Sequence, residues 1–157
     1  MGDPVSGPTK ALRLISAIPG RFSVTHNTGK VGRFGTSGRG DIPSLLGLMD
    51  PDIEWSEAEG NPYQPSGKAW RGPDAIVQNL FVKIGADFDG TFVVHPKDFY
   101  DAGDTVVVEG RYTGTFKATG KSLDAQVCHV FKVRDSKITS FQQFVDTAQL
   151  QDVMGAR

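Results

Sequence analysis

His129 and Tyr112 stand at positions from which their side chains could take part in proton transfer. The stretch 123–134 alternates between apolar and polar side chains, a pattern typical of a β-strand with one buried face. Lys132 marks the other face as exposed, so we expect His129 to point inward, where an imidazole can donate to an oxyanion or exchange a proton. The same argument places Tyr112 inside, with a hydroxyl that could polarise a carbonyl group. The alternative is that His129 is a core residue bonded only to Tyr112 or to a backbone carbonyl.

The last predicted strand, residues 138–146, leaves open which of its faces lines the interior. Phe141 and Gln143 share one face, and Phe144 and Asp146 share the other. Gln143 and Asp146 therefore compete for the inward position. Asp146 also suits the N-cap of a short helix that follows it, because an aspartate side chain accepts the free N–H groups of a first helical turn.

The cysteine and histidine content excludes several kinds of site. One cysteine and three scattered histidines provide no metal-ligand spacing, so we expect no metal site and no cofactor. No Gly-x-Ser-x-Gly motif is present and nothing pairs Cys128 with a base, so nucleophilic catalysis is not expected. The glycines that recur between 29 and 40 fit neither a phosphate-binding loop, since no apolar strand precedes them, nor a robust helix.

The length of 157 residues, with 38% hydrophobic and 22% charged residues, is enough for one globular domain with a core. The first 40 residues carry six Lys or Arg and one Asp, whereas the whole chain has a net charge of −1. We therefore predict a basic, flexible leader over 1–24 and a single domain over 25–157. The charge gives no reason to expect nucleic acid as a partner, and no apolar run is long enough for a membrane span. With one cysteine and no signal-peptide pattern, we expect a cytoplasmic location.

Two helices followed by four strands are predicted along the domain. The first helix begins at Asp41 and ends at Pro51, and the second runs from Pro73 to Gly85. Between them lie a strand at 52–57 and a long loop over 60–72. Four further strands are predicted from alternating side chains, at 91–100, 105–113, 123–134 and 138–146. The turns between these four strands are short and imply antiparallel pairing, so we expect an α+β fold with helices on one face of a bent sheet.

The order and spacing of several segments resemble the SnoaL-like branch of the nuclear transport factor 2-like superfamily. These segments are GKAWRGPDAI (67–76), DTVVVEGRYTG (104–114), TGK (119–121), HVFKVRDSKI (129–138) and FVDTAQL (144–150). The superfamily includes ketosteroid isomerase, polyketide cyclases, scytalone dehydratase and limonene epoxide hydrolase. The resemblance implies a cone-shaped α+β barrel, in which a strongly curved, mainly antiparallel sheet wraps around N-terminal helices and encloses a central apolar pocket. It also implies a homodimer formed through the outer sheet face, where we place Cys128 and Val130.

The resemblance also implies roles for individual residues. His129 stands where the isomerases keep a protonated aspartic acid that donates to an oxyanion. Asp146 corresponds to an aspartate of a late strand that polyketide cyclases use as acid–base group. Ser56 falls where the isomerases hold their proton-abstracting carboxylate, a role that serine cannot fill. A shifted register could recruit Glu54 or Glu57, for which a solvated surface carboxylate is the alternative.

Pocket walls in this superfamily are aromatic, which directs attention to the tryptophan and tyrosine residues. The residues that we expect to contact a ligand are Trp55, Tyr63, Trp70, Phe131, Gln143 and Glu54. Core packing explains Trp55 and Trp70 equally well. The epoxide hydrolases use an Asp–Arg–Asp set, for which Arg111 with Asp124 and Asp146 offers the residue types, but alternation predicts an outward Arg111.

Together these features predict a cofactor-free enzyme of the isomerase, cyclase or dehydratase type that binds a small, largely apolar carbonyl compound in a central pocket. His129 and Asp146 would hold or move the proton, and Tyr112 would polarise the carbonyl. Two alternatives stay open. One is a non-catalytic ligand-binding or interaction domain of the same fold, which the serine at position 56 favours. The other is an epoxide-hydrolase-like enzyme, which requires Arg111 to face the pocket.

Overall fold

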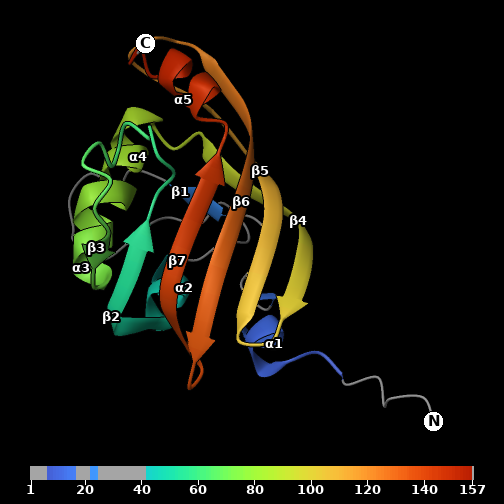
Figure 1. The fold of residues 1–157 in the computed structure, drawn as a ribbon. Coiled ribbons are helices and arrows are strands. Elements are labelled where there is room, and N and C mark those ends of the chain that lie inside the picture. Colours follow the sequence, from blue (N-terminus) through green and yellow to red (C-terminus); the bar gives the residue numbers. More distant parts are fainter. Residues whose placement is uncertain (1–6, 17–21, 25–41, 157) are drawn as a thin grey trace.

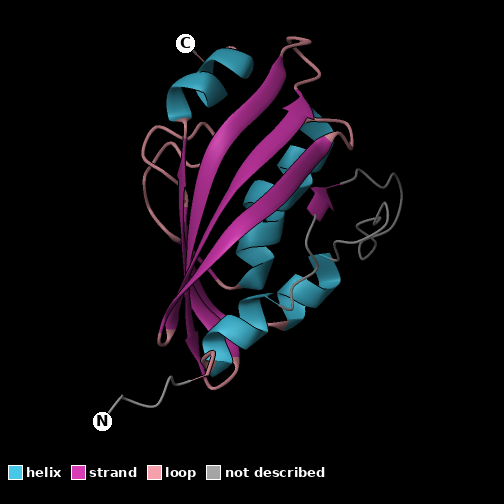
Figure 2. Cartoon of the chain, turned by 90° about the vertical axis from the view of Figure 1, so that its right-hand side faces the viewer, coloured by secondary structure: helices cyan, strands magenta, loops and turns pink. Residues whose placement is uncertain are grey.

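The computed structural model describes residues 7–16, 22–24 and 42–156, which form a curved sheet with helices on one side (Figures 1 and 2). The strands are β1 (Phe22–Val24), β2 (Met49–Ser56), β3 (Trp70–Arg71), β4 (Phe92–Ala102), β5 (Thr105–Thr115), β6 (Ser122–Arg134) and β7 (Lys137–Val145). The helices are α1 (Lys10–Ser16), α2 (Ile42–Gly47), α3 (Pro73–Ile76), the π-helical turn η1 (Val77–Phe81), α4 (Val82–Asp87) and α5 (Thr147–Val153). None of these described helices is long and apolar enough to cross a membrane. The predictions for the glycine-rich stretch 25–40 and for a helix start at Asp41 lie outside the described residues.

The sheet combines an antiparallel meander with one parallel neighbour. Its strand order is β1-β4-β5-β6-β7-β2-β3. The consecutive strands β4 to β7 pair antiparallel, which confirms the predicted meander. β2 lies beside β7 in parallel, with Trp55 opposite Phe141. The sequence does not predict this pairing, because parallel strands are joined by long connections that carry no turn signal.

The core lies between the concave face of the sheet and the helices (Figure 2). Alternate residues of β5 and β6 are buried there, for example Val106 and Val108 in β5. Ile76 and Phe88, from the helical side, are fully buried in the same core. This alternation confirms the inward face that the sequence predicts for the two strands, and it sets which of their polar side chains can reach the interior.

The first predicted helix is shorter than its apolar pattern suggests. α2 ends at Gly47, whereas the prediction extended it to Pro51. The chain leaves the helix there because the carbonyl of Leu48 accepts the backbone N–H of Ile138 from β7 at 2.7 Å. Pro51 consequently lies inside β2 rather than at the end of a helix.

The second predicted helix is present as the succession of α3, η1 and α4, and it runs past Gly85 to Asp87. A π-helical turn contains one residue more than an α-helical turn. The consecutive residues Leu80 and Phe81 of this turn are both buried. Val77, which regular helical spacing predicts to face inward, is only half-buried.

The segment predicted as a flexible leader contributes to the fold in its described part. Ala11 and Ile15 of α1 are buried in the core. Thr9, next to α1, donates its backbone N–H and its hydroxyl to the side chain of Asp101, at 2.9 and 2.7 Å. Apolar residues four positions apart give even a short helix one face that can pack. Residues 10–16 are therefore a packed helix, in contrast to the flexibility predicted for them.

A bulge in β4 bends the sheet. The register between β4 and β5 shifts between Pro96 and Asp98. Gly110 of β5 faces this bulge, and a Cβ atom at its position would overlap with the carbonyl oxygen of His95. A residue without a side chain is therefore needed for the two strands to approach each other here.

Substitution of Gly110 by alanine should destabilise the protein, because the added methyl group forces β4 and β5 apart at the bulge. We expect Gly110→Ala to lower the free energy of unfolding by about 1–3 kcal/mol, measured by urea denaturation. Gly47→Ala is the matched control, since a Cβ atom there meets nothing within 4 Å. Equal denaturation midpoints for the two variants would contradict the close approach.

Candidate active site

A cavity of about 100 Å³ lies on the concave side of the sheet. Its wall is mostly apolar, with contributions from Ile15 of α1, Leu45 of α2 and Phe81 of η1. The polar residues of the wall are Glu57, Asn61, Tyr63, Tyr112, His129 and Gln143. Among the described residues, no lysine or arginine lines the cavity, and no group of three or more His, Cys, Asp or Glu could hold a metal ion.

Glu57 is a buried carboxylate in the cavity wall. It directly follows β2 and is 6% exposed. The indole N–H of Trp55 donates to its Oε1 at 2.6 Å, and the side-chain amide of Asn61 donates to its Oε2 at 3.0 Å. Burial raises the pKa of Glu57 to about 7, although the hydrogen bond from Trp55 opposes this rise. A carboxyl group with a pKa near neutrality can both accept and return a proton at physiological pH.

The turn after β2 holds Glu57 in place. The backbone N–H of Glu57 donates to Oε1 of Gln64 at 2.9 Å, and Nε2 of Gln64 donates to the carbonyl of Trp55 at 3.2 Å. Within the turn, the backbone N–H of Tyr63 donates to Oδ1 of Asn61 at 2.9 Å. Gln64 and Asn61 are both buried, so these bonds are shielded from water and fix the backbone that carries the Glu57 side chain.

Tyr112, His129 and Gln143 form a second polar group, with one residue on each of β5, β6 and β7. Gln143 lies opposite His129 in the register of the two strands. The hydroxyl of Tyr112 lies 2.5 Å from Nε2 of His129, and the side-chain amide of Gln143 donates to the Tyr112 oxygen at 3.0 Å. Phe131 and Phe141 pack against the imidazole ring. The three polar side chains therefore meet at one wall of an otherwise aromatic surface.

The hydrogen bonds of Gln143 determine where the hydroxyl proton of Tyr112 points. Oε1 of Gln143 accepts the backbone N–H of Ala58 at 3.3 Å and the amide of Asn61 at 3.0 Å, so its own amide donors face Tyr112. The Tyr112 oxygen accepts from Gln143 and directs its proton to Nε2 of His129. Burial lowers the pKa of His129 to about 3, so the imidazole is neutral and Nε2 can accept. Burial also raises the pKa of Tyr112, so its hydroxyl remains a donor.

Several residues predicted from the sequence lie in the cavity wall. These are His129, Tyr112, Gln143, Trp55, Phe131 and Tyr63. The open question about the last strand is also answered, since Gln143 is buried and Phe144 is exposed. The hydroxyl of Tyr63 donates to Asp87 at 2.8 Å, so this residue contributes its ring to the cavity and uses its polar group elsewhere.

Two of the expected ligand contacts lie outside the cavity wall. Glu54 alternates with Trp55 along β2, so its side chain is exposed, and it pairs with Arg71 at 2.6 Å. Trp70, in the edge strand β3, is half-buried and packs against the core. The alternative that Trp70 packs in the core therefore holds, and neither Glu54 nor Trp70 is placed to contact a ligand in the cavity.

Asp146 caps a helix and does not reach the cavity. Its carboxylate accepts the backbone N–H of Gln149 at 3.1 Å at the N-terminus of α5. The residue is exposed, because it continues the face of β7 that carries Phe144. The capping interpretation therefore holds, and the expected acid–base role for Asp146 is not supported by its position.

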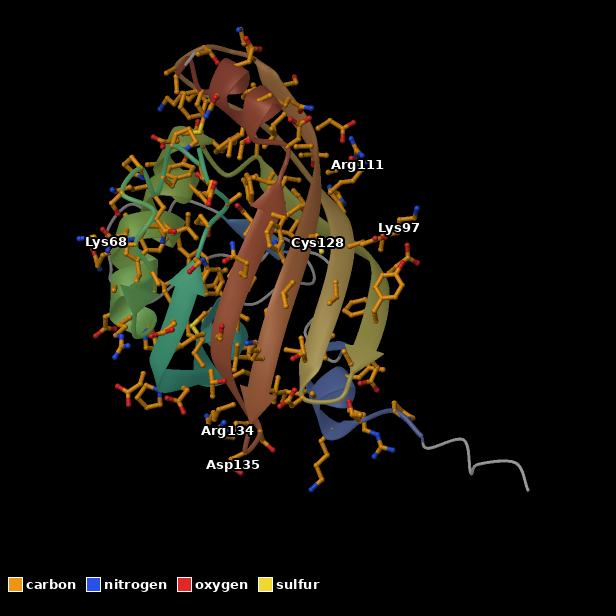
Figure 3. All side chains as sticks on the ribbon, viewed as in Figure 1. Lys68, Lys97, Arg111, Cys128, Arg134 and Asp135 are labelled. Atoms are coloured by element: carbon orange, nitrogen blue, oxygen red, sulfur yellow. The ribbon has the colours of Figure 1, made fainter. Side chains whose placement is uncertain are left out.

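Arg111 lies on the outer surface of the sheet (Figure 3). Its Nε donates to the side chain of Asp124 at 2.7 Å, and both side chains are exposed. The outward orientation follows the alternation of β5, in which Tyr112 points inward. The Asp–Arg–Asp set of an epoxide hydrolase is therefore not assembled in this cavity.

Asn61 is the site residue that the sequence prediction missed, and Glu57 was named there only as an alternative that a shifted register could recruit. A signal for Glu57 was present, since Ile53, Trp55 and Glu57 occupy alternate positions and therefore share one face. A carboxylate at this position continues the buried face of the strand, so alternation predicts an inward side chain. Asn61 lies in a turn, where no periodic pattern indicates the direction of a side chain.

The pH dependence of stability should report the ionisation of Glu57. Its folded pKa of about 7 lies above the ordinary 4.5. The contribution of neutral Glu57 to the free energy of unfolding is therefore complete below pH 4.5 and is lost as the pH rises to 7. His129 acts in the opposite direction, since the contribution of its neutral imidazole to the free energy of unfolding is lost as the pH falls from 6.5 toward 3. Relative to Glu57→Gln, the wild type should therefore lose about 3 kcal/mol of unfolding free energy between pH 4.5 and 7.5, measured by denaturant titration.

The exposed Glu59 provides the control for this experiment, because it belongs to the same turn and is in contact with solvent. Glu59→Gln should follow the wild type across the whole pH range. A constant difference between the wild type and Glu57→Gln would mean that Glu57 does not titrate in this window.

The chain matches the model of the SnoaL-like domain over residues 34–141. An NTF2-like protein from Burkholderia thailandensis is 38% identical, with a TM-score of 0.67 over 73% of this chain and 85% of that chain. TerC, co-crystallised with polyporic acid, is 27% identical, with a TM-score of 0.64 over 73% of this chain and 86% of that chain. No curated protein matches the sequence significantly. With this sequence match and this fold, the chain belongs to the SnoaL-like domain family of NTF2-like proteins.

Proposed function

We propose that the protein is a cofactor-free enzyme that moves a proton on a small, largely apolar carbonyl compound. Glu57 would be the acid–base group, and Tyr112 would donate a hydrogen bond to the carbonyl oxygen. The observation that carries this proposal is a carboxylate with a pKa of about 7 in the wall of an apolar cavity. Perturbed carboxylates of this kind are typical of active sites, because a general base works best when its pKa is near the working pH.

The reaction would begin with the ionised form of Glu57. One carboxylate oxygen accepts a proton from the carbon next to the carbonyl, and the electron pair of the broken C–H bond moves to the carbonyl oxygen. The neutral Glu57 then returns the proton to another carbon of the enolate in an isomerisation, or to a hydroxyl that leaves as water when the enolate collapses in a dehydration. In a ring closure, the enolate carbon forms a bond to a second carbonyl carbon of the same compound, and Glu57 gives its proton to the oxygen that receives the electron pair of that carbonyl. Trp55 and Asn61 can keep their hydrogen bonds throughout, because each carboxylate oxygen has a second lone pair.

Tyr112 and His129 would stabilise the developing oxyanion. A ligand oxygen that accepts the hydroxyl proton of Tyr112 takes the place of Nε2 of His129 as acceptor. If the imidazole then loses its Nδ1 proton to solvent and takes up a solvent proton at Nε2, the neutral ring would donate to the Tyr112 oxygen, as Gln143 already does. In the low-dielectric surroundings of Phe131 and Phe141 such donors act more strongly on an oxyanion than they do in water.

A non-catalytic ligand-binding domain is the second candidate. It is favoured by the closed hydrogen-bond network, since no buried side-chain nitrogen or oxygen of the described residues lacks a partner. A network satisfied in this way can hold a fixed pocket shape without any chemistry. TerC, which was co-crystallised with polyporic acid, supports a small organic ligand under either candidate.

Exchange of carbon-bound hydrogen with solvent tests the enzymatic candidate directly. In D₂O, the wild type should catalyse deuterium incorporation next to the carbonyl of at least one compound in a panel of cyclic enones and aromatic ketones, followed by NMR. Glu57→Gln should lower the exchange rate about 10²-fold or more, and Tyr112→Phe should lower it by a factor of about 10².

Glu59→Gln is again the control and should exchange at the wild-type rate. Compounds that raise the melting temperature of the wild type but show no exchange would identify the binding domain instead. An exchange rate that is unaffected by Glu57→Gln would contradict the assigned role of the carboxylate.

We also propose that the protein forms a homodimer through the outer face of the sheet. This face carries an apolar strip of neighbouring side chains from four strands, and Cys128 of the strip is labelled in Figure 3. The strip consists of Tyr100, Val107, Cys128, Val130 and Phe144. Tyr100 is 49% exposed and Phe144 is 55% exposed, and a contiguous apolar surface of this kind marks an interface more often than a solvated face.

A cytoplasmic location without a nucleic-acid partner stays a prediction of the sequence.

Phe144→Glu should convert the dimer into a monomer, because an isologous interface buries the new charge twice. Sedimentation velocity at micromolar concentration measures the change. Val82→Glu is the control, since Val82 is 40% exposed on α4, away from the strip. A monomeric wild type would contradict the proposed interface.

A further inference from the structure

We propose that Asn61 is the positioning residue of this site, which joins the Glu57 carboxylate to the hydrogen-bond chain of Gln143, Tyr112 and His129. The inference rests on the proposed function, because it assigns the two polar groups to one reaction. The amide nitrogen of Asn61 lies 3.0 Å from Oε2 of Glu57 and 3.0 Å from Oε1 of Gln143. Among the described residues, no other side chain bonds to the side chains of both polar groups, since Nε2 of Gln142 donates only to the backbone carbonyls of Glu57 and Gln143.

The orientation of the Asn61 amide is determined by its surroundings. Its two N–H donors are used by Glu57 and Gln143, and its carbonyl oxygen accepts the backbone N–H of Tyr63 at 2.9 Å. An inverted amide would place an oxygen against two acceptors and an NH₂ group against a donor. At 2% exposure no water can relieve such a mismatch, so only one orientation is compatible with the site.

Asn61 acts on Tyr112 through Gln143. By donating to Oε1 of Gln143, together with the backbone N–H of Ala58, it turns the amide donors of Gln143 toward the Tyr112 oxygen. The Tyr112 oxygen is thereby supplied with a donor, and its own proton is left for His129 or for a ligand oxygen. Without Asn61, Gln143 could rotate and present its carbonyl to Tyr112, which would then donate to Gln143 instead of into the cavity.

Asn61 acts on Glu57 by stabilising its ionised form. The titratable groups that share the cavity wall with Glu57 are Tyr63 from the same turn, Tyr112 from β5 and His129 from β6, and Asp87 of α4 accepts from Tyr63. None of them supplies a positive charge, because the loss of water around the imidazole lowers the pKa of His129 and keeps the ring neutral. The donors Trp55 and Asn61 are therefore what offsets the loss of water around the carboxylate.

The experiment measures the pKa of Glu57 by NMR titration of its side-chain carboxyl carbon in the full chain. Asn61→Ala should raise this pKa by about one unit or more, because a hydrogen bond to the ionised form is lost. Gln64→Ala is the matched control, since Gln64 is buried in the same turn and its side chain bonds to the backbone of Glu57 and Trp55, not to the carboxylate. It should lower stability and leave the pKa of Glu57 within half a unit of the wild-type value. Should Asn61→Ala fail to fold, Asn61→Ser, which keeps one short donor and one acceptor, is titrated in its place.

A second measurement follows the imidazole of His129. In the wild type, ¹⁵N shifts should show the proton on Nδ1, and in Asn61→Ala the signal of Nε2 should move as its bond from Tyr112 weakens. An unchanged Glu57 pKa together with an unchanged Nε2 signal in the folded variant overturns the inference. If both move while the wild type exchanges no deuterium with any compound, the positioning role stands and the proposed function fails. If exchange occurs, its pH profile should shift in Asn61→Ala by the same amount as the pKa.

Discussion

Burial of the Glu57 carboxylate in an apolar cavity is the constraint on which the rest of the site depends. An ionised carboxylate loses its hydration there, and only N–H or O–H donors can replace the lost water. Trp55 and Asn61 provide one N–H group to each oxygen. Both donors are neutral, so they reduce the cost of the charge without cancelling it, and the pKa stays near 7. A lysine or arginine in their place would hold the carboxylate permanently ionised.

The sheet topology brings the two polar groups together. β2 runs parallel to β7 with Trp55 opposite Phe141, and their rings stack with centroids 3.7 Å apart. Two residues further along the chain from each ring, Glu57 and Gln143 follow on the same inward face. The parallel pairing therefore delivers a carboxylate from the early part of the chain to a cluster built by three later strands. Asn61, in the turn that begins there, closes the remaining gap.

The sequence predicts those parts of the structure that local periodicity controls. The strands of the meander and the inward faces of Tyr112 and His129 follow from alternation alone, because successive side chains of a strand point to opposite sides. Glu57 could have been recognised from the same parity, but its partners Asn61 and Gln143 become visible only once β2 is paired with β7. Tertiary pairing of distant segments leaves no mark on local periodicity. The packed helix α1 escaped prediction for a related reason, since Ala11 and Ile15 are its only fully buried residues among those whose side chains the structure describes.

The cavity wall divides into two parts with different origins in the chain. All the polar groups belong to residues 57 to 143, whereas Ile15 of α1 and Ile42 and Leu45 of α2 contribute only apolar side chains to the wall. Substitutions in these two helices can therefore alter the size and shape of the ligand that fits, while the hydrogen-bond network around Glu57 remains intact. A scaffold divided in this way allows selection to exchange one ligand for another without rebuilding the chemistry. Relatives with different ligands would then be expected to differ most in their N-terminal helices.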